Sequence, residues 1–207
     1  MVKKGDFPMK LLLASKNKDK IQEIKSLLYD LKIEILTFKD FNFFPETIED
    51  RPTLEGNAEK KARTIWKKFN LPSLADDTGL FVDAIDGKPG VYSSRFAGED
   101  VTYKQNRKKL LYMLRDIPKE KRTATFKTVI VFIDKKGNQI VVKGEYKGYI
   151  GFEEKGDNGF GYDSIFYCKS SNKTFAELSS YAKNKVSHRG IALRKIRSII
   201  EKVVKNI

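Results

Sequence analysis

The residues of this chain best suited to catalysis are two adjacent carboxylates, Asp76 and Asp77, followed by Thr78 and Gly79. They come directly after a short apolar run that begins at Leu74 and reads as a strand. An Asp-Asp-Thr-Gly sequence usually forms a turn and nothing more. Acids at the carboxyl end of a strand, however, also lie where open α/β sheets bind their ligands. Both interpretations, turn and site, remain open from these residues alone.

A polar segment between an apolar run and a helical pattern is a candidate phosphate site. Its hydroxyl, amide and lysine groups stand where a helix N-terminus supplies unpaired N–H donors and a favourable dipole. The alternative is an ordinary helix cap with solvated lysines. The segment contains neither a Walker A loop nor a G-x-G-x-x-G sequence. Its residues are Ser15, Lys16, Asn17, Lys18, Asp19 and Lys20.

Acids in two separate segments predict a magnesium site. Glu46, Glu49 and Asp50 lie in a long loop, and Asp76 and Asp77 follow the later apolar run. Mg²⁺ takes one or two carboxylates together with waters and substrate phosphate oxygens, so this combination suits it. A neighbouring carboxylate could accept a proton from an attacking water. The loop acids could equally solvate a surface loop, which is the interpretation we favour for Glu46.

Two further segments carry groups that could bind a base. Glycines around Phe160 and Tyr162 allow close backbone approach and leave a ring available for stacking, although a turn would also use glycines. Near the end of the chain, Lys183, His188 and Arg189 offer directional donors to a keto group or a phosphate. A lone histidine is more often structural. No Ser-His-Asp arrangement is indicated.

Composition limits the class of protein. The 207 residues fit one domain, or two lobes that share a cleft. Forty-one basic residues against 27 acidic give a net charge of +14, which favours anionic partners. One cysteine and one histidine exclude a disulfide framework and a Cys/His zinc site. Without an apolar stretch of membrane-spanning length or a signal sequence, we expect a cytoplasmic protein with no membrane partner.

The hydrophobic pattern predicts an α/β order. We expect strands at residues 9–14 and 33–36 with a helix between them, a helix over residues 54–69, and a strand that begins at residue 73. A helix over residues 100–115 follows.

The second half of the chain reads differently. Strands at residues 123–133 and 139–149 flank a hairpin loop, another strand covers residues 165–167, and a basic helix covers residues 191–204. We therefore expect one domain over residues 9–207, with a β-rich lobe around residues 120–168. A short basic extension at residues 1–8 precedes it.

Six motifs follow one another along the chain: Ser15-x-Asn17-x-x-Lys20, Asn57-Ala58 with Lys61-Ala62-Arg63, Ala75 to Leu80, Pro89 to Arg95, Gly159 to Asp163, and Ser187 to Gly190. Together they resemble the inosine triphosphate pyrophosphatase family, the XTP/dITP diphosphatases. The resemblance covers nearly the whole chain. It implies an elongated α/β fold with a central mixed β-sheet flanked by helices, two lobes with a nucleotide cleft between them, and usually a homodimer. It also implies Mg²⁺-dependent hydrolysis of ITP, dITP and XTP to the monophosphate and pyrophosphate.

The resemblance also assigns roles to individual residues. Asp77 matches the proton acceptor and metal ligand, Asp76 is its acidic neighbour, and Glu49 matches the loop acid that binds the metal. The stretch Asp50-Arg51-Pro52 departs from the family pattern, which makes Glu49 the least secure match. The residues expected to bind the triphosphate and the base are Ser15, Lys16, Asn17, Lys18, Asp19, Lys20, Lys61, Thr78, Arg95, Phe160, Gly161, Tyr162, Asp163, Lys183, His188 and Arg189.

Two other functions fit parts of the sequence. A Maf-like pyrophosphatase would prefer modified pyrimidine nucleotides, and a nucleotide panel separates the two enzymes. A non-catalytic nucleic-acid-binding protein would fit the charge of +14, but the chain lacks a basic-aromatic motif or helix-turn-helix signature, so no specific nucleic acid is expected.

Overall fold

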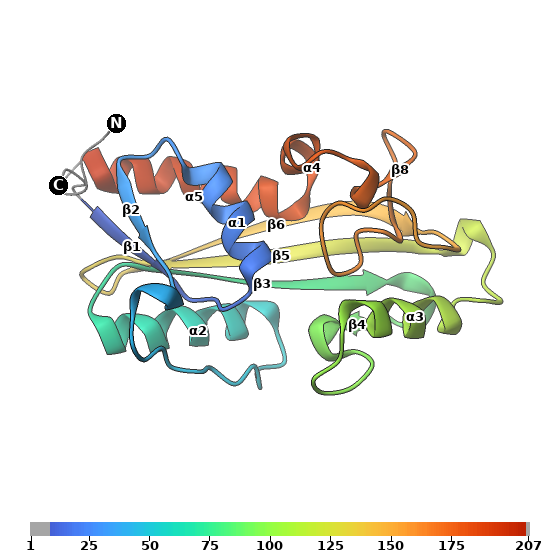
Figure 1. Ribbon diagram of the computed structural model, residues 1–207, viewed down its shortest axis with the longest axis horizontal. Coiled ribbons are helices and arrows are strands. Elements are labelled where there is room, and N and C mark those ends of the chain that lie inside the picture. Colours follow the sequence, from blue (N-terminus) through green and yellow to red (C-terminus); the bar gives the residue numbers. More distant parts are fainter. Residues whose placement is uncertain (1–8, 206–207) are drawn as a thin grey trace. The chain divides into compact units, whose positions relative to one another are not determined.

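The computed structural model describes residues 9–205, so the predicted basic extension at residues 1–8 lies outside the described residues. Within this range the chain forms a mixed, open sheet flanked by helices, as expected (Figure 1). The order of the paired strands is β2-β1-β3-β5-β6-β7-β8, and β4 pairs with β3. The strands are β1 (Met9–Leu13), β2 (Ile33–Leu36), β3 (Ser73–Val82), β4 (Pro89–Gly90), β5 (Thr123–Ile133), β6 (Gln139–Ile150), β7 (Phe166–Cys168) and β8 (Lys173–Thr174).

Parallel and antiparallel pairs both occur in the sheet. Strand β1 runs parallel to β2 and to β3, whereas β4 is antiparallel to β3 and β7 is antiparallel to both β6 and β8. The helices are α1 (Lys18–Leu28), α2 (Leu54–Phe69), α3 (Tyr103–Met113), α4 (Ser180–Val186) and α5 (His188–Lys205). Among the described residues, none of these helices combines the length and the apolar character needed to cross a membrane.

The chain groups into two compact units, each made of separate stretches of sequence. The first unit holds the residues up to Asp77, Val129–Lys143 and the residues from Ala192 onward. The second unit holds Thr78–Thr128 and Gly144–Ile191. The boundary within β3 therefore falls between Asp77 and Thr78.

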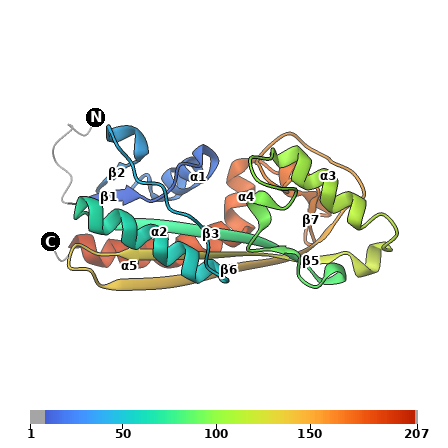
Figure 2. The ribbon, with the colours of Figure 1, turned by 90° about the horizontal axis from the view of Figure 1, so that it is seen from below.

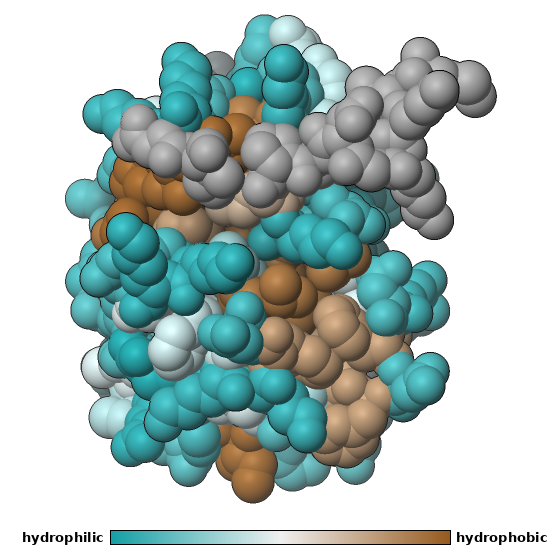
Figure 3. All heavy atoms as spheres, turned by 90° about the vertical axis from the view of Figure 1, so that its left-hand side faces the viewer, coloured by the Kyte–Doolittle hydropathy of each residue, from teal (hydrophilic) through white to brown (hydrophobic). Residues whose placement is uncertain are grey.

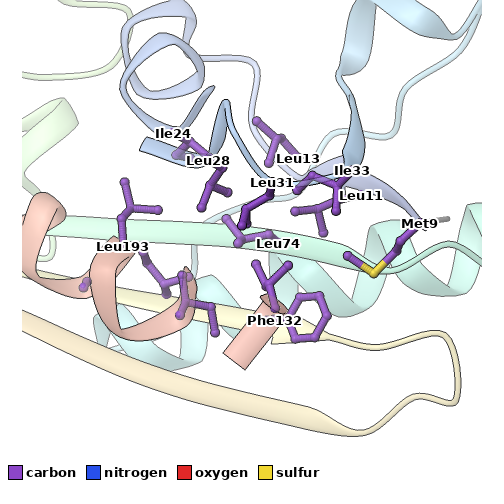
Figure 4. Close-up of a cluster of buried hydrophobic side chains, with 14 of the residues drawn as sticks. Met9, Leu11, Leu13, Ile24, Leu28, Leu31, Ile33, Leu74, Phe132 and Leu193 are labelled. Carbon is purple, nitrogen blue, oxygen red and sulfur yellow. The ribbon is translucent and has the colours of Figure 1, made fainter. Parts of the chain in front are cut away.

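The core of the first unit lies between its strands and two helices. Apolar side chains of β1, α1 and β2 meet those of α5 in one buried cluster, and Leu11, Leu28, Ile33, Leu74 and Leu193 point toward one another (Figure 4). Burial of this kind contributes about 25 cal/mol per Å² of apolar surface, which makes the cluster the main support of these elements. Helix α2 lies on the opposite face of these strands from α1 and α5 (Figure 1).

The surface of the first unit matches the lysine-rich composition. Hydrophilic residues cover most of the face shown in Figure 3, with hydrophobic residues exposed in bands between them. On this face, hydrophilic side chains cover more area than hydrophobic ones, as is usual for a chain rich in lysine.

The second unit has a core of its own. Leu110 and Leu114, from α3 and the residue that caps it, pack with Phe126, Phe166 and Phe175. Helix α3 and strand β7, both labelled in Figure 2, each contribute side chains to this cluster. Because Tyr162 and Ile165 belong to this core, it anchors the segment between β6 and β7, which holds the predicted binding residues from Phe160 to Asp163.

Most expected elements are confirmed, some to the residue. Strands β2 and β5 and helix α2 have the predicted bounds, and Asp134 N donates to Asn138 O at 3.0 Å in the predicted hairpin. Each of these segments has an apolar pattern of clear period, or turn residues with defined backbone preferences.

Two predictions about local structure are wrong, and one short helix was not predicted. Asp76 and Asp77 are neither in a turn nor at the end of a strand, because β3 continues through them to Val82. His188 and Arg189 do not precede the last helix but form its first turn, and Lys183 lies in the unpredicted short helix α4. In β3, lysines from distant segments compensate the buried acids, so the strand need not end where its apolar residues end.

Candidate functional site

In the first unit, the loop between β1 and α1 is shaped by its own side chains. Asn17 caps α1: its Oδ1 accepts from the backbone N of Asp19 at 3.0 Å and of Lys20 at 3.1 Å. Ser15 Oγ in turn accepts from Asn17 N at 3.2 Å. The capping interpretation is therefore correct for Asn17, and two of the N–H groups at the helix start already have an acceptor. Lys16 and Lys18 are exposed.

Two of the predicted lysines of the first unit, Lys20 and Lys61, face the predicted acids. Lys20 Nζ lies 3.2 Å from Asp76 Oδ2. Lys61 Nζ lies 2.8 Å from both Asp77 Oδ1 and Glu49 Oε1, and it also donates to the backbone O of Asp76 at 2.7 Å. Segments far apart in sequence thus converge on one ammonium group.

Helix α2 holds Lys61 in this position. Thr53 caps the helix by accepting from Gly56 N, and the buried residues Ala58, Ala62 and Ile65 pack its inner face. Lys61 belongs to the same buried face and is only 9% exposed. Its aliphatic stem is therefore covered, and its ammonium group emerges among the carboxylates.

The charges in this cluster shift the affinity of its groups for protons. Burial lowers the pKa of Lys61, but the negative charges of Asp77, Glu49 and Asp76 together outweigh burial and raise that pKa above its ordinary value. Burial raises the pKa of Asp77, although Lys61 and Lys20 oppose the shift. A buried carboxylate with a raised pKa is the kind of group that can accept a proton in catalysis.

The carboxylates of this cluster suit a magnesium ion that takes its remaining ligands from water and the substrate. Glu49 Oε1 and Asp77 Oδ1 approach the same cation, the Lys61 ammonium, which shows that the two oxygens can share one positive charge. Within residues 9–205, no group of three or more His, Cys, Asp or Glu side chains could hold a metal. Two carboxylates suit Mg²⁺, which keeps waters and takes phosphate oxygens as further ligands.

In the second unit, Asp163 organises the predicted base-binding residues. Its Oδ2 accepts from Lys183 Nζ at 2.6 Å and from the backbone N of Phe160 at 2.8 Å. Asp163 is 3% exposed and Lys183 is 4% exposed, so the ion pair is buried. Lys183 Nζ lies 4.9 Å and Arg189 Cζ 5.4 Å from the centre of the Phe160 ring. One ring is therefore flanked by two cations.

A chain of hydroxyl groups supports Arg189. Its Nη2 donates to Thr78 Oγ1 at 3.0 Å, and Thr78 Oγ1 is hydrogen-bonded to Thr128 Oγ1. Thr128 is fully buried on β5. A guanidinium can only donate, so Thr78 Oγ1 must be the acceptor in its bond to Arg189.

Helix α3 holds the loop that contains Phe160. Arg107 Nη1 donates to the backbone O of Gly161 at 2.8 Å, and its Nη2 pairs with Glu154 at 2.8 Å. The ring of Tyr103 lies 5.9 Å from that of Phe160. Gly161 adopts a φ of 62°, a left-handed conformation that favours glycine at this bend.

Three predicted binding residues have contacts of a structural kind. Tyr162 donates its hydroxyl to Ser93 O at 2.8 Å and packs in the core. His188 is 2% exposed and stacks on Phe126 at 4.4 Å between ring centres. Arg95 lies over the ring of Tyr92. Their direct roles in binding remain predictions.

Some residues of these clusters were not selected from the sequence. Thr128, Arg107 and Tyr103 lie in segments whose pattern predicted only a strand or a helix, and no local signal distinguishes them. Asn57 belongs to one of the recognised motifs but had no role assigned. It donates from Nδ2 toward Asp77 Oδ2 at 3.5 Å.

Comparison with known proteins gives consistent results. The chain is similar to a dITP/XTP pyrophosphatase of Leuconostoc mesenteroides, at 47% identity over 191 residues, which covers 91% of this chain and 94% of the relative. It is also similar to one of Geobacter sulfurreducens, at 46% identity over 184 residues, with coverages of 89% and 92%.

Solved structures show the same relationship. The HAM1 protein of Coxiella burnetii superposes with a TM-score of 0.85 at 38% identity, covering 94% of this chain and 99% of that one. The Ham1 protein of Staphylococcus aureus gives a TM-score of 0.83 at 35% identity, with coverages of 93% and 98%. The sequence profile of the Ham1 family matches residues 11–199, and the chain therefore belongs to the Ham1 family.

Proposed function

We propose that this protein hydrolyses the non-canonical purine nucleotides dITP, ITP and XTP to the nucleoside monophosphate and pyrophosphate. The observation that carries the proposal is the cluster of the buried Lys61 and Asp77 with the half-buried Glu49, because it joins a candidate base, a cation for phosphate and two candidate metal-binding oxygens. Relatives at 46–47% identity are named dITP/XTP pyrophosphatases, which supports the same substrates.

In this proposal the first unit binds the triphosphate. Lys20 and Lys61 offset charge on its oxygens, and the leaving pyrophosphate is stabilised by the same two ammonium groups. Glu49 and Asp77 would hold magnesium. When bound, Mg²⁺ would act as a Lewis acid that neutralises phosphate charge. Asp77, with Asp76 beside it, orients a water and accepts its proton as the water attacks the α-phosphorus.

The second unit binds the base. Phe160 provides a ring for stacking, and Lys183 and Arg189 provide donors near that ring. A 6-keto group accepts such hydrogen bonds, whereas the 6-amino group of adenine would leave the donors unpaired, which favours hypoxanthine and xanthine over adenine. His188 remains a predicted contact. The predicted homodimer and cytoplasmic location also stay predictions.

The test is pyrophosphate release from a panel of nucleotides with and without Mg²⁺. We expect turnover of dITP, ITP and XTP, little turnover of dATP, and loss of activity on chelation. Preferred turnover of methylated pyrimidine triphosphates would favour the Maf-like alternative. An absence of pyrophosphate release from every nucleotide, together with salt-sensitive binding to DNA or RNA, would favour a nucleic-acid-binding protein.

A further inference from the structure

Asn57 is a buried amide in the first unit that the proposed reaction does not use directly. It is 1% exposed and lies in the second turn of α2. Its Oδ1 accepts from the backbone N of Arg51 at 2.9 Å, and its Nδ2 donates to the backbone O of Arg51 at 3.3 Å. The side chain of Asn57 thus holds the backbone N–H and C=O groups of Arg51, which lies two residues after Glu49.

The amide of Asn57 also faces the candidate base. Nδ2 lies 3.5 Å from Asp77 Oδ2, a long hydrogen bond, whereas Lys61 donates to the other oxygen, Oδ1. An amide turned over by half a rotation would place its oxygen against Arg51 O and Asp77 Oδ2. The surrounding acceptors therefore select the orientation that has Nδ2 toward Asp77.

Asn57 and Lys61 are one helical turn apart, at i and i+4, so they project from the same face of α2. The ammonium group of Lys61 contacts Asp77 Oδ1 and Glu49 Oε1. The amide of Asn57 holds the chain just beyond Glu49 and the other oxygen of Asp77. Lys61 compensates the negative charge of this pair of acids, whereas the neutral amide of Asn57 holds them in position.

We propose that Asn57 is a positioning residue that sets the spacing of Glu49 and Asp77 and thereby the affinity of the protein for Mg²⁺. This inference rests on the proposed function, in which these two acids hold the metal. Residues that orient metal ligands through hydrogen bonds commonly change metal affinity or activity by about 10- to 100-fold when they are replaced. Asn57 itself touches neither the nucleotide nor the metal in this proposal.

A matched control exists in the second unit. Asn106 occupies the same position in α3, four residues after its cap Thr102, as Asn57 occupies after Thr53 in α2. It is 2% exposed, accepts from Ala97 N at 2.7 Å and donates to Ser94 O at 2.9 Å. Within the described part of the chain, its amide forms hydrogen bonds only with backbone groups. Replacement of Asn106 therefore removes a similar pair of backbone hydrogen bonds without disturbing a carboxylate.

The experiment compares Asn57→Ala with Asn106→Ala in the full chain. We expect Asn57→Ala to raise the Mg²⁺ concentration for half-maximal turnover about 10-fold or more, with kcat at saturating Mg²⁺ within about threefold of the parent. Asn106→Ala should lower Tm comparably but leave the Mg²⁺ dependence unchanged. Hydrogen exchange without metal should be faster at the Arg51 amide in Asn57→Ala.

An unchanged Mg²⁺ dependence in Asn57→Ala, or an equal change in Asn106→Ala, would overturn the inference and leave the proposed function intact. If Asn57→Ala does not fold, Asn57→Ser replaces it, since its shorter side chain cannot reach both Arg51 and Asp77. If the parent releases no pyrophosphate, the proposed function fails. Calorimetric titration of Mg²⁺ into parent and variant then decides the positioning role, and equal affinities would exclude it.

Discussion

Lys61 Nζ lies 2.8 Å from Asp77 Oδ1, and both side chains are almost fully buried. A buried lysine is costly unless its charge is compensated, and here Glu49 and the backbone O of Asp76 complete its coordination. The pair therefore serves both the fold and the proposed chemistry of the first unit.

Replacement of Lys61 should destabilise the fold as well as abolish activity. Lys61→Met leaves Asp77 buried without its cation, and breaking such a pair costs about 3–5 kcal/mol. The adjacent Lys60 forms an ion pair with Asp50 that is more exposed, so Lys60→Met should cost much less. Urea denaturation of the two variants measures the difference. Equal costs would contradict the central position given to Lys61.

Asp77→Asn should remove the proton acceptor while it keeps the size of the side chain. We expect turnover of dITP to fall by about 100-fold or more, since a general base contributes at least that factor. Asp76→Asn should have a smaller effect on kcat, because Asp76 Oδ2 pairs with Lys20. Steady-state kinetics checks both. Near-normal turnover by Asp77→Asn would show that another group is the base.

Thr128→Val should weaken substrate binding through Thr78 and Arg189. The loss of one buried hydroxyl partner costs about 1 kcal/mol, or roughly a fivefold increase in KM. Thr128→Ser keeps the hydroxyl and is the control, with a KM near that of the parent. If the serine and valine variants have the same KM for dITP, the hydroxyl does not support Arg189.

The ion pair of Asp30 and Arg197 predicts how stability depends on pH. Hydrogen bonds from Arg197 at 2.5 and 2.7 Å lower the pKa of Asp30 below its ordinary value. A carboxyl with a lowered pKa stabilises the fold above its unfolded pKa of about 3.9, and that contribution is lost as the pH falls through the folded pKa.

At pH 7, Asp30→Asn should therefore be less stable than the parent by about 0.2–1 kcal/mol, as expected for a pair that is partly exposed. The difference should disappear in acid, below the folded pKa of Asp30. Tm values of both proteins across this range test the prediction. A difference that persists unchanged in acid would show that the ion pair is not its cause.

The sequence by itself determined most of the secondary structure and the family. Helix α2 and strands β2 and β5 follow from apolar residues of clear period, a property of the local chain. The motif residues that resemble the family, from Ser15 to Arg189, could be identified because their types and order are chemical information carried by the sequence alone.

Only the tertiary structure decided what those residues contact. No local pattern shows that β3 continues through Asp76 and Asp77, since the compensating Lys20 and Lys61 come from distant segments. The capping role of Asn17 likewise depends on how the chain folds at the start of α1, where its side chain meets the backbone N of Asp19.

The same reason explains Asn57 and Thr128. Each is an ordinary polar residue of a helix or a strand in the sequence, and its role depends on a hydrogen bond to a residue at least 20 positions away. Hydrogen bonds act over about 3 Å, and folding determines which distant groups reach that separation. Residue types fix the available chemistry, and the packing of the chain determines which groups can act together.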